Sequence, residues 1–340
     1  MATHADRKPR APAILFTRRA AVMSLLVFLA TVPVVNVAAQ TYPMRPVLLV
    51  VPFPPGGPTD AVARTFASKF SEAWGQQVIV DNRAGANTIV AAEMVAKALA
   101  DGYTLFQPAA TTLVNNTLLY RKLPYDAQKS FAPISMTVIN PYLLVIHPSL
   151  PANSIRELVV LAKKRPGELT YASSGTGSSG HLAGVLFDAM TGTRMVHVPY
   201  KGSSAANIDT LSGQVPVYFT TMASVRVHYA QRKFKALGFA MAKRHAAWPD
   251  IPAIAEAGYP GYEMNTWYAF VAPAGTPRAV IDRVHAETVR VAAMPDVVKR
   301  MNALDLDIIT NTPEEFAARI VTDLEHSRSI VRAAKIAPLE

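Results

Sequence analysis

The chain has no cysteine among its 340 residues. A disulfide framework, catalysis by a thiolate and a cysteine metal site are therefore excluded. Histidine ligation of a metal is not indicated either, because no H-E-x-x-H motif or similar spacing occurs. Without disulfides the protein must rely on its hydrophobic core, and 50% apolar with 17% charged residues suit a globular chain rather than a disordered one.

Further absences narrow the class of protein. No cluster of lysine and arginine is interleaved with aromatic residues, so we expect no nucleic-acid partner. The sequence has no G-x-S-x-G motif, which leaves a nucleophile elbow unsupported, and no internal repeat. Beyond residue 39 no apolar run is long enough to span a bilayer, so we expect a soluble mature protein.

Residues 1–39 have the composition of a secretory signal. Five basic residues precede an apolar stretch at 20–35, and Val37-Ala38-Ala39 forms a small-residue cleavage site. A retained membrane anchor is the competing interpretation, and both Sec and twin-arginine export stay open. The segment carries five basic residues and Asp6, so its removal lowers the formal charge of +10 by 4 and leaves +6, a balance that attracts anionic solutes. We therefore expect an exported protein.

The stretch Val47–Asp60 reads VLLVVPFPPGGPTD and carries the first functional signal. Its continuous apolar start predicts a strand buried on both faces, as in a parallel sheet. Gly56 and Gly57 permit a tight turn, and Pro58 suits the first turn of a helix because its missing N–H is not needed there. Free N–H groups and the positive end of the helix dipole then make an anion site. On this motif alone, an ordinary strand-to-helix turn is an equal alternative.

Short apolar strands alternate with amphipathic helices along the chain, which is typical of a layered α/β fold. We expect strands at 47–51, 78–80, 103–106, 142–146, 169–172, 195–198, 215–219, 234–239 and 267–272, and helices at 59–74, 88–99, 154–164, 182–190, 208–211, 277–293 and 313–334. The stretch 120–133 reads as a connector punctuated by prolines.

The order of these elements predicts two lobes. One lobe comprises 42–141 plus 267–340 and the other 142–266, and the two crossings form a two-strand hinge. The third strand runs into small and hydroxylated residues that include Ala110 and Thr111. Ligands of open α/β sheets lie at such carboxyl ends of strands.

A second glycine-rich turn, Ser173–His181, follows another strand and precedes a helix. Gly175, Gly177 and Gly180 match G-x-G-x-x-G, the dinucleotide-binding pattern. That pattern also needs an acidic residue about 20 positions later, and 196–204 contains none. A nucleotide-dependent enzyme is therefore the alternative hypothesis, while the density of hydroxyl groups favours a second anion cradle.

Three residues have two open interpretations each. Asp60 lies in the first turn of its helix, where it either caps the helix or faces the ligand. In the second case its carboxylate would repel an anion unless other loop groups or water bond to that carboxylate. His181 is a ligand contact or general base, or else a structural hydrogen-bond partner. Trp267 walls the cleft or packs in the core.

The chain resembles the Bug-type extracytoplasmic solute receptors of tripartite tricarboxylate transporters. The resemblance spans nearly the whole mature sequence and rests on VPFPPGGPTD, DNRAGA, DGYTL, KLPYD, YASSGTGSSGHL, VHVPYKG, EAGYPGYE with the following Trp267, and APAGTP. It implies a two-lobed periplasmic binding protein of type II, each lobe a mixed sheet flanked by helices, closing on a small carboxylate. It further implies a monomer without cofactor, metal or catalysis, whose partners are membrane permease subunits of the transporter. A ligand-sensing partner of a membrane sensor is a further alternative.

In that family the first glycine loop and the Ser/Gly loop hold the ligand carboxylate together with ordered water. These loops correspond to residues 53–60 and 174–181 here. One departure lies at 216–221, PVYFTT, where an acidic pocket residue common in the family is absent. This favours an uncharged, hydroxylated or aromatic acid over an amino acid, within the small di- or tricarboxylic or aromatic acids that the resemblance implies as ligands. The ligand-binding residues expected on these grounds are Phe53, Pro55, Gly56, Gly57, Thr59, Asp60, Ala110, Thr111, Ser174, Gly175, Gly177, Ser178, Ser179, His181, Thr220 and Trp267.

Overall fold

The computed structural model describes residues 1–2, 42–333 and 336. The expected signal segment, residues 1–39, lies outside the described residues except for Met1 and Ala2, and the fold described below is that of the unit that begins at Tyr42. None of the helices in the described part is both long enough and apolar enough to cross a membrane.

A mixed sheet runs through this unit, with ten strands in the described part of the chain. The strand order is β2 (Val78–Asn82), β1 (Val47–Val51), β3 (Thr104–Phe106), β9 (Asn265–Pro273), β4 (Phe131–Ile146), β7 (Val217–Thr221), β5 (Thr170–Ser173) and β6 (Val196–Pro199). Two further strands, β8 (Lys235–Phe239) and β10 (Asp307–Ile308), also pair with β4. The pairs of β1 with β2 and β3, and of β5 with β6 and β7, are parallel, whereas β4 and β9 run antiparallel to their neighbours.

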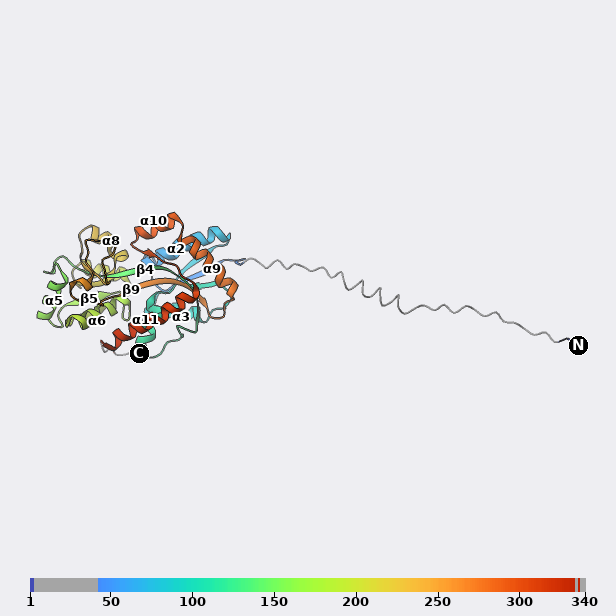
Figure 1. Cartoon of the computed structure of the whole chain (residues 1–340), viewed down its shortest axis with the longest axis horizontal. Coiled ribbons are helices and arrows are strands. Elements are labelled where there is room, and N and C mark those ends of the chain that lie inside the picture. Colours follow the sequence, from blue (N-terminus) through green and yellow to red (C-terminus); the bar gives the residue numbers. More distant parts are fainter. Residues whose placement is uncertain (3–41, 334–335, 337–340) are drawn as a thin grey trace. The chain divides into compact units, whose positions relative to one another are not determined.

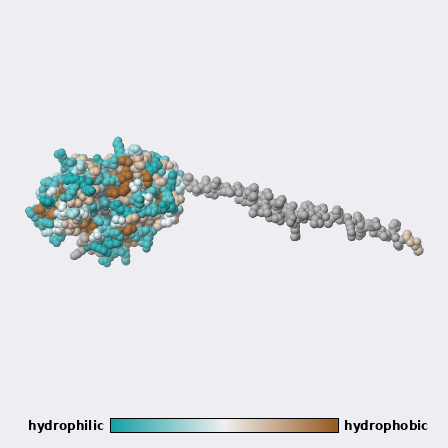
Figure 2. All heavy atoms as spheres, in the orientation of Figure 1, coloured by the Kyte–Doolittle hydropathy of each residue, from teal (hydrophilic) through white to brown (hydrophobic). Residues whose placement is uncertain are grey.

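The helices connect these strands and cover the sheet. They are α2 (Pro58–Trp74), α3 (Ile89–Ala96), α4 (Asn116–Leu119), α5 (Ile155–Lys164), α6 (Ser179–Thr191), α7 (Ser203–Leu211), α8 (Met222–Ala230), α9 (Arg278–Ala292), α10 (Pro295–Ala303) and α11 (Pro313–Ala333). On the face drawn in Figure 2, hydrophobic surface occurs as separate patches among hydrophilic residues.

Strand β1 is covered on both sides, as its apolar run predicts. Val47, Leu49 and Val51 lie in a core formed with α2 and α9, whereas Val50 lies in a second core formed with α3 and α11. Figure 1 shows these two pairs of helices on opposite sides of the strands. Because both faces are buried, the loop that leaves β1 starts from a rigid position.

Strand β4 is the largest difference from the sequence-based expectation. The last three residues of the connector expected at 120–133 and the strand expected at 142–146 belong to one strand of 16 residues, Phe131–Ile146, whereas 121–130 connects without a strand, as expected. Pro141 is its last residue paired with β9, and Tyr142 is the first paired with β7. Prolines argue against a strand in sequence because they donate no ladder hydrogen bond. Here the register shifts just after Pro133, and the pairing partner changes after Pro141.

Three nine-residue helices were missed or cut short by the sequence patterns, and the four-residue helix α4 was missed as well. Helix α7 begins at Ser203 instead of 208, and α8 and α10 were not expected. Each has 9 residues and buries only two side chains, such as Ala206 and Thr210 in α7. Two buried positions are too few to establish a helical period.

Candidate functional site

The loop between β1 and α2 presents an uncapped helix N-terminus. Gly57 is the N-cap residue and has no side-chain cap, and Pro58 occupies the first turn. In the described part of the chain, the N–H groups of Thr59 and Asp60 donate no hydrogen bond to another group. The helix therefore exposes unpaired amides at the positive end of its dipole, which is the arrangement that binds anions.

Asp60 is bonded within this loop. Its Oδ2 accepts hydrogen bonds from the Gly56 N–H at 3.0 Å and from Arg64 Nε at 2.9 Å. Burial by itself raises the pKa of Asp60, but the bonds from Arg64 and Gly56 outweigh it and lower the pKa. The carboxylate thus holds the turn, and the Gly56 N–H is already occupied.

A cavity of about 230 Å³ lies beside this helix end. Its walls come from the β1–α2 loop, the segment after β3, the loops after β5 and β6, the first turns of α7 and α8, and strands β4, β7 and β9. The lining residues are Phe53, Pro54, Pro55, Gly57, Pro58, Thr59, Ala109, Thr111, Tyr142, Ser174, Lys201, Gly202, Ser203, Ser204, Ala205, Tyr218, Phe219, Thr220, Thr221, Ser224, Thr266 and Tyr268. The cavity therefore lies at the carboxyl ends of the parallel strands, where α/β sheets place ligands.

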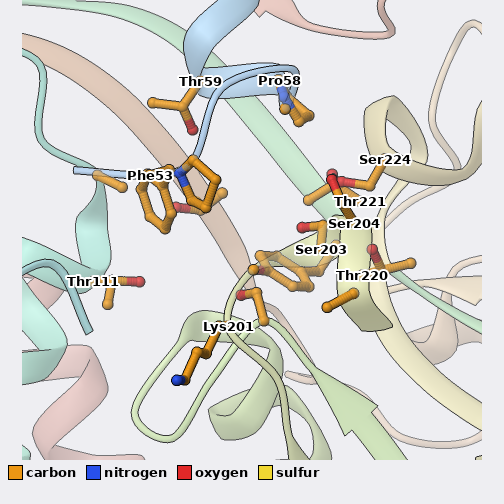
Figure 3. Close-up of a pocket in the computed structure, with 18 of the residues that line it drawn as sticks. Phe53, Pro58, Thr59, Thr111, Lys201, Ser203, Ser204, Thr220, Thr221 and Ser224 are labelled. Atoms are coloured by element: carbon orange, nitrogen blue, oxygen red, sulfur yellow. The ribbon is translucent and has the colours of Figure 1, made fainter. Parts of the chain in front are cut away.

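Two further uncapped helix ends reach the same cavity. Helix α7 has Gly202 as N-cap and α8 has Thr221, and neither N-cap residue makes a side-chain capping bond. Figure 3 shows Phe53, Pro58 and Thr59 facing the hydroxyl-bearing residues of α7 and α8 across the cavity. The second helix N-terminus at this cavity thus belongs to α7, which follows the segment Pro199–Gly202.

The second glycine turn contributes less than its sequence suggests, because its polar groups bond to one another. The Ser178 hydroxyl caps α6 by accepting the His181 N–H, and His181 Nδ1 accepts the Gly177 N–H at 3.1 Å. Ser173 Oγ donates to the Gly175 carbonyl at 2.9 Å. Of this turn, Ser174 is the residue that lines the cavity.

His181 and His197 form a stacked pair behind this turn, with ring centroids 4.0 Å apart. Burial lowers the pKa of His181 to about 4. Burial, followed by the neighbouring His181, lowers the pKa of His197 to about 3. Both rings are therefore neutral near pH 7, and His197 Nε2 lies 2.7 Å from Ser173 Oγ. The pair orders the turn and does not line the cavity.

The sequence-predicted ligand residues divide into two groups. Those that line the cavity are Phe53, Pro55, Gly57, Thr59, Thr111, Ser174 and Thr220. Those outside its lining are Gly56, Asp60, Ala110, Gly175, Gly177, Ser178, Ser179, His181 and Trp267. Trp267 is buried in the core, where its indole N–H donates to Asp323 at 2.7 Å and its ring meets Phe316 edge-on.

The electrostatic character of the cavity is one-sided. Lys201 is the charged side chain among the lining residues, and no aspartate or glutamate is among them. Burial raises the pKa of Tyr218 to about 12 and also raises that of Tyr142, so both phenols stay protonated, and the Tyr218 hydroxyl donates to the Ser203 carbonyl at 3.5 Å. In the described part of the chain, no cluster of three or more histidine, aspartate or glutamate side chains is placed to hold a metal ion.

Sequence reasoning did not single out Lys201, Ser203 and Ser204, or the tyrosines of the cavity. A signal for the α7 group was present, because Pro199–Gly202 ends a strand with a glycine and a helix follows. The tyrosines had no local signal, since Tyr142, Tyr218 and Tyr268 lie inside strands and their position at the cavity depends on sheet order.

Comparisons with known proteins agree in pointing to one family. The family model described as "Tripartite tricarboxylate transporter family receptor" (TctC) matches residues 62–336. A protein from the tcbD–tcbE intergenic region of Pseudomonas sp. strain P51 is 39% identical over 86% of this chain and 87% of its own length. The protein BugT of Bordetella pertussis is 34% identical over 93% of this chain and 97% of its own length.

A solved structure shares the fold closely. The R. palustris protein Rpa4515, solved with adipate, aligns with a TM-score of 0.85 and 34% identity, covering 88% of this chain and all of that one. The predicted fold class is confirmed: the chain has the α/β fold of periplasmic binding proteins of this type, with mixed sheet flanked by helices.

Proposed function

Since the chain belongs to the family of tripartite tricarboxylate transporter receptors of the Bug type, we propose that its cavity binds the carboxylate group of a small organic acid and that the receptor delivers the acid to membrane permease subunits. Like the other members of this family, the chain is a solute-binding receptor and not an enzyme. The proposal concerns the class of ligand, the site and the partner.

One observation carries the proposal: the N-termini of α2, α7 and α8 converge without side-chain caps on a cavity that contains a lysine and no carboxylate. An anion there meets unpaired N–H groups, hydroxyl donors and the positive ends of three helix dipoles. A bound cation would find no opposite charge in the lining. The adipate bound to the R. palustris relative supports a carboxylate as ligand.

The nucleotide hypothesis loses its structural basis in the second glycine turn. Phosphate binding at G-x-G-x-x-G relies on free amides at the following helix N-terminus. At α6 the Gly177 N–H and the His181 N–H already donate to His181 and Ser178. We therefore do not propose nucleotide binding.

The ligand must be able to enter and leave the cavity. We propose that two lobes, 42–141 plus 267–340 and 142–266, open to admit the ligand and close on it. The change of partner in β4 between Pro141 and Tyr142 supports a hinge at this crossing. The buried cores support the division as well, because one pair of cores draws on 47–138 and 267–324, and the other almost entirely on 142–264. We propose export to the periplasm through residues 1–39 and action as a monomer.

A thermal-shift screen on residues 40–340 tests ligand binding. Mono-, di- and tricarboxylates are compared with amino acids, nucleotides and uncharged sugars, and calorimetry measures the best candidates. We expect stabilisation by carboxylates, since a ligand that binds only the folded state raises the free energy of unfolding. Stabilisation by uncharged sugars alone would contradict the proposal. Uptake of the labelled acid by cells with and without the receptor gene tests delivery to a permease.

A further inference from the structure

A second cavity, of about 670 Å³, adjoins the first. The two cavities share a wall formed by Phe53, Pro54, Ser174, Lys201 and Gly202. A Cβ placed on Gly202 would lie 3.7 Å from Cδ of Pro54, so the two loops touch where the cavities meet. Lys201, the charged residue of the first cavity, therefore stands at the boundary with the second.

The second cavity differs from the first in chemistry. Besides the shared wall it is bounded by prolines 52 and 199, by residues 84–88 and 175–176, and by Tyr120 and Tyr200. The Tyr200 hydroxyl donates to Asp209 at 2.7 Å, so it is already engaged. No aspartate or glutamate lines this cavity, and its surface is more apolar than that of the first. Away from Lys201 in the shared wall, its lining carries no charged side chain and therefore suits an uncharged organic group.

One wall of the second cavity is a strained segment of backbone. Ala86, Asn87 and Thr88 have consecutive φ values of 42°, 50° and 77°, which residues other than glycine rarely adopt. Reciprocal bonds of 2.8 Å between Asn87 and Asn116 hold the segment in place. Strained residues of this kind cluster at ligand clamps, where surrounding contacts impose them.

The strained segment also meets the opposite wall. A Cβ on Gly177 would lie 2.8 Å from Asn87 Nδ2, and φ at Gly177 is +80°, so glycine is favoured where the second glycine turn meets Asn87. The second cavity is thus enclosed by segments from both proposed lobes. This gives the glycine turn a role that the first cavity alone does not explain.

We propose that the second cavity receives the apolar body of the ligand, whose carboxylate lies in the first cavity, so that this receptor takes an acid with an aromatic ring or an extended hydrocarbon chain. The inference rests on the proposed function and narrows its ligand class. Pockets that enclose a drug-sized ligand have volumes of about 300–1,000 Å³. The first cavity is smaller than that range and the second falls within it.

The test compares acids that share a carboxylate and differ in their body. Calorimetry measures acetate, succinate, octanoate, benzoate and phenylbutyrate with the wild-type protein and with Ala84→Phe, which fills the second cavity from an exposed loop position. We expect the wild-type protein to prefer the acids with the larger body, and Ala84→Phe to lose about tenfold in affinity for the preferred one while short acids bind as before. The aliphatic and aromatic arms distinguish the two kinds of body.

Two further variants keep the outcome decisive. Thr176→Phe fills the same cavity from the opposite wall and should have the same effect, and Ala286→Phe, on the exposed side of α9, is the matched control that should change nothing. If affinity is independent of the body in the wild-type protein and in all three variants, the second-cavity proposal is overturned while carboxylate binding stands. If no acid binds the wild-type protein at all, the proposed function itself fails.

Discussion

The carboxylate of Asp60 accepts the N–H of Gly56 four residues before it, at 3.0 Å, and closes the first glycine loop on itself. The same oxygen accepts Arg64 Nε at 2.9 Å. The negative charge of Asp60, which lies beside the proposed anion site, is thereby compensated by the Gly56 N–H and by Arg64. The N–H groups of Thr59 and Asp60 stay open at the helix end.

Replacing Asp60 should weaken the fold through this loop. We expect Asp60→Ala to lower the free energy of unfolding by about 1–3 kcal/mol, because the Gly56 N–H and Arg64 Nε both lose the charged acceptor that the buried Asp60 provides. Asp60→Asn should cost less, since an amide oxygen still accepts that bond. Urea unfolding at pH 7 measures both variants, and equal losses would show that the Gly56 bond is not the cause.

The first loop should tolerate a side chain in the fold but not in the site. A Cβ on Gly57 meets nothing within 4 Å, and its φ of −87° is ordinary. We therefore expect Gly57→Val to cost the fold ~1 kcal/mol or less as a poorer N-cap, and to weaken acid binding by about 1.5–3 kcal/mol as it crowds the charge-assisted amide contacts.

Gly180→Ala is the comparison variant for this prediction, because there we expect the fold to lose stability. A Cβ there would lie 2.6 Å from the Phe219 carbonyl oxygen, so this variant should lose stability in unfolding experiments. Unchanged acid affinity in Gly57→Val, measured by calorimetry, would place the ligand elsewhere.

Lys201 should contribute a long-range, salt-dependent part of the affinity. We expect Lys201→Met to weaken acid binding by ~1 kcal/mol or less, because the side chain is exposed and screened by solvent. The loss should shrink as ionic strength rises. The control is Lys164→Met in the last turn of α5, outside both cavities. Calorimetry at low and high salt checks the prediction, and an equal loss in the control would attribute the effect to net charge.

The stacked histidines should make the fold sensitive to acid. Burial lowers the pKa of His181 to about 4 and that of His197 to about 3, below the ordinary value of about 6.5. The unfolded chain therefore takes up protons first as the pH falls below about 6.5, so stability decreases from there toward pH 4, by up to ~1.4 kcal/mol per pH unit for each histidine.

Urea unfolding between pH 5 and pH 7 measures this slope. In His197→Gln the slope should be smaller by about one proton, and His326→Gln, outside both cavities and the stacked pair, serves as the control. A slope that is the same in all three proteins would assign the acid sensitivity to carboxylates.

Local patterns in the sequence were sufficient for the elements that depend on neighbours along the chain. The apolar run 47–51 does form a strand buried on both faces, and Gly57-Pro58 does begin a helix with open amides. The order of strands and helices likewise predicted the α/β class, and the family motifs predicted the family. Each of these depends on backbone preferences or on burial that recurs at short spacing.

Tertiary structure decided which of the similar glycine turns has free donors at the cavity. The turns at 174–181 and 199–204 both join a strand to a helix, but Ser178 and His181 bond back onto the first, while the second leaves its helix uncapped. Pairing with β9 also extended β4 through two prolines. Hydrogen bonds and strand pairings of this kind join residues through space, so their outcome depends on the whole fold and not on the local order of residues.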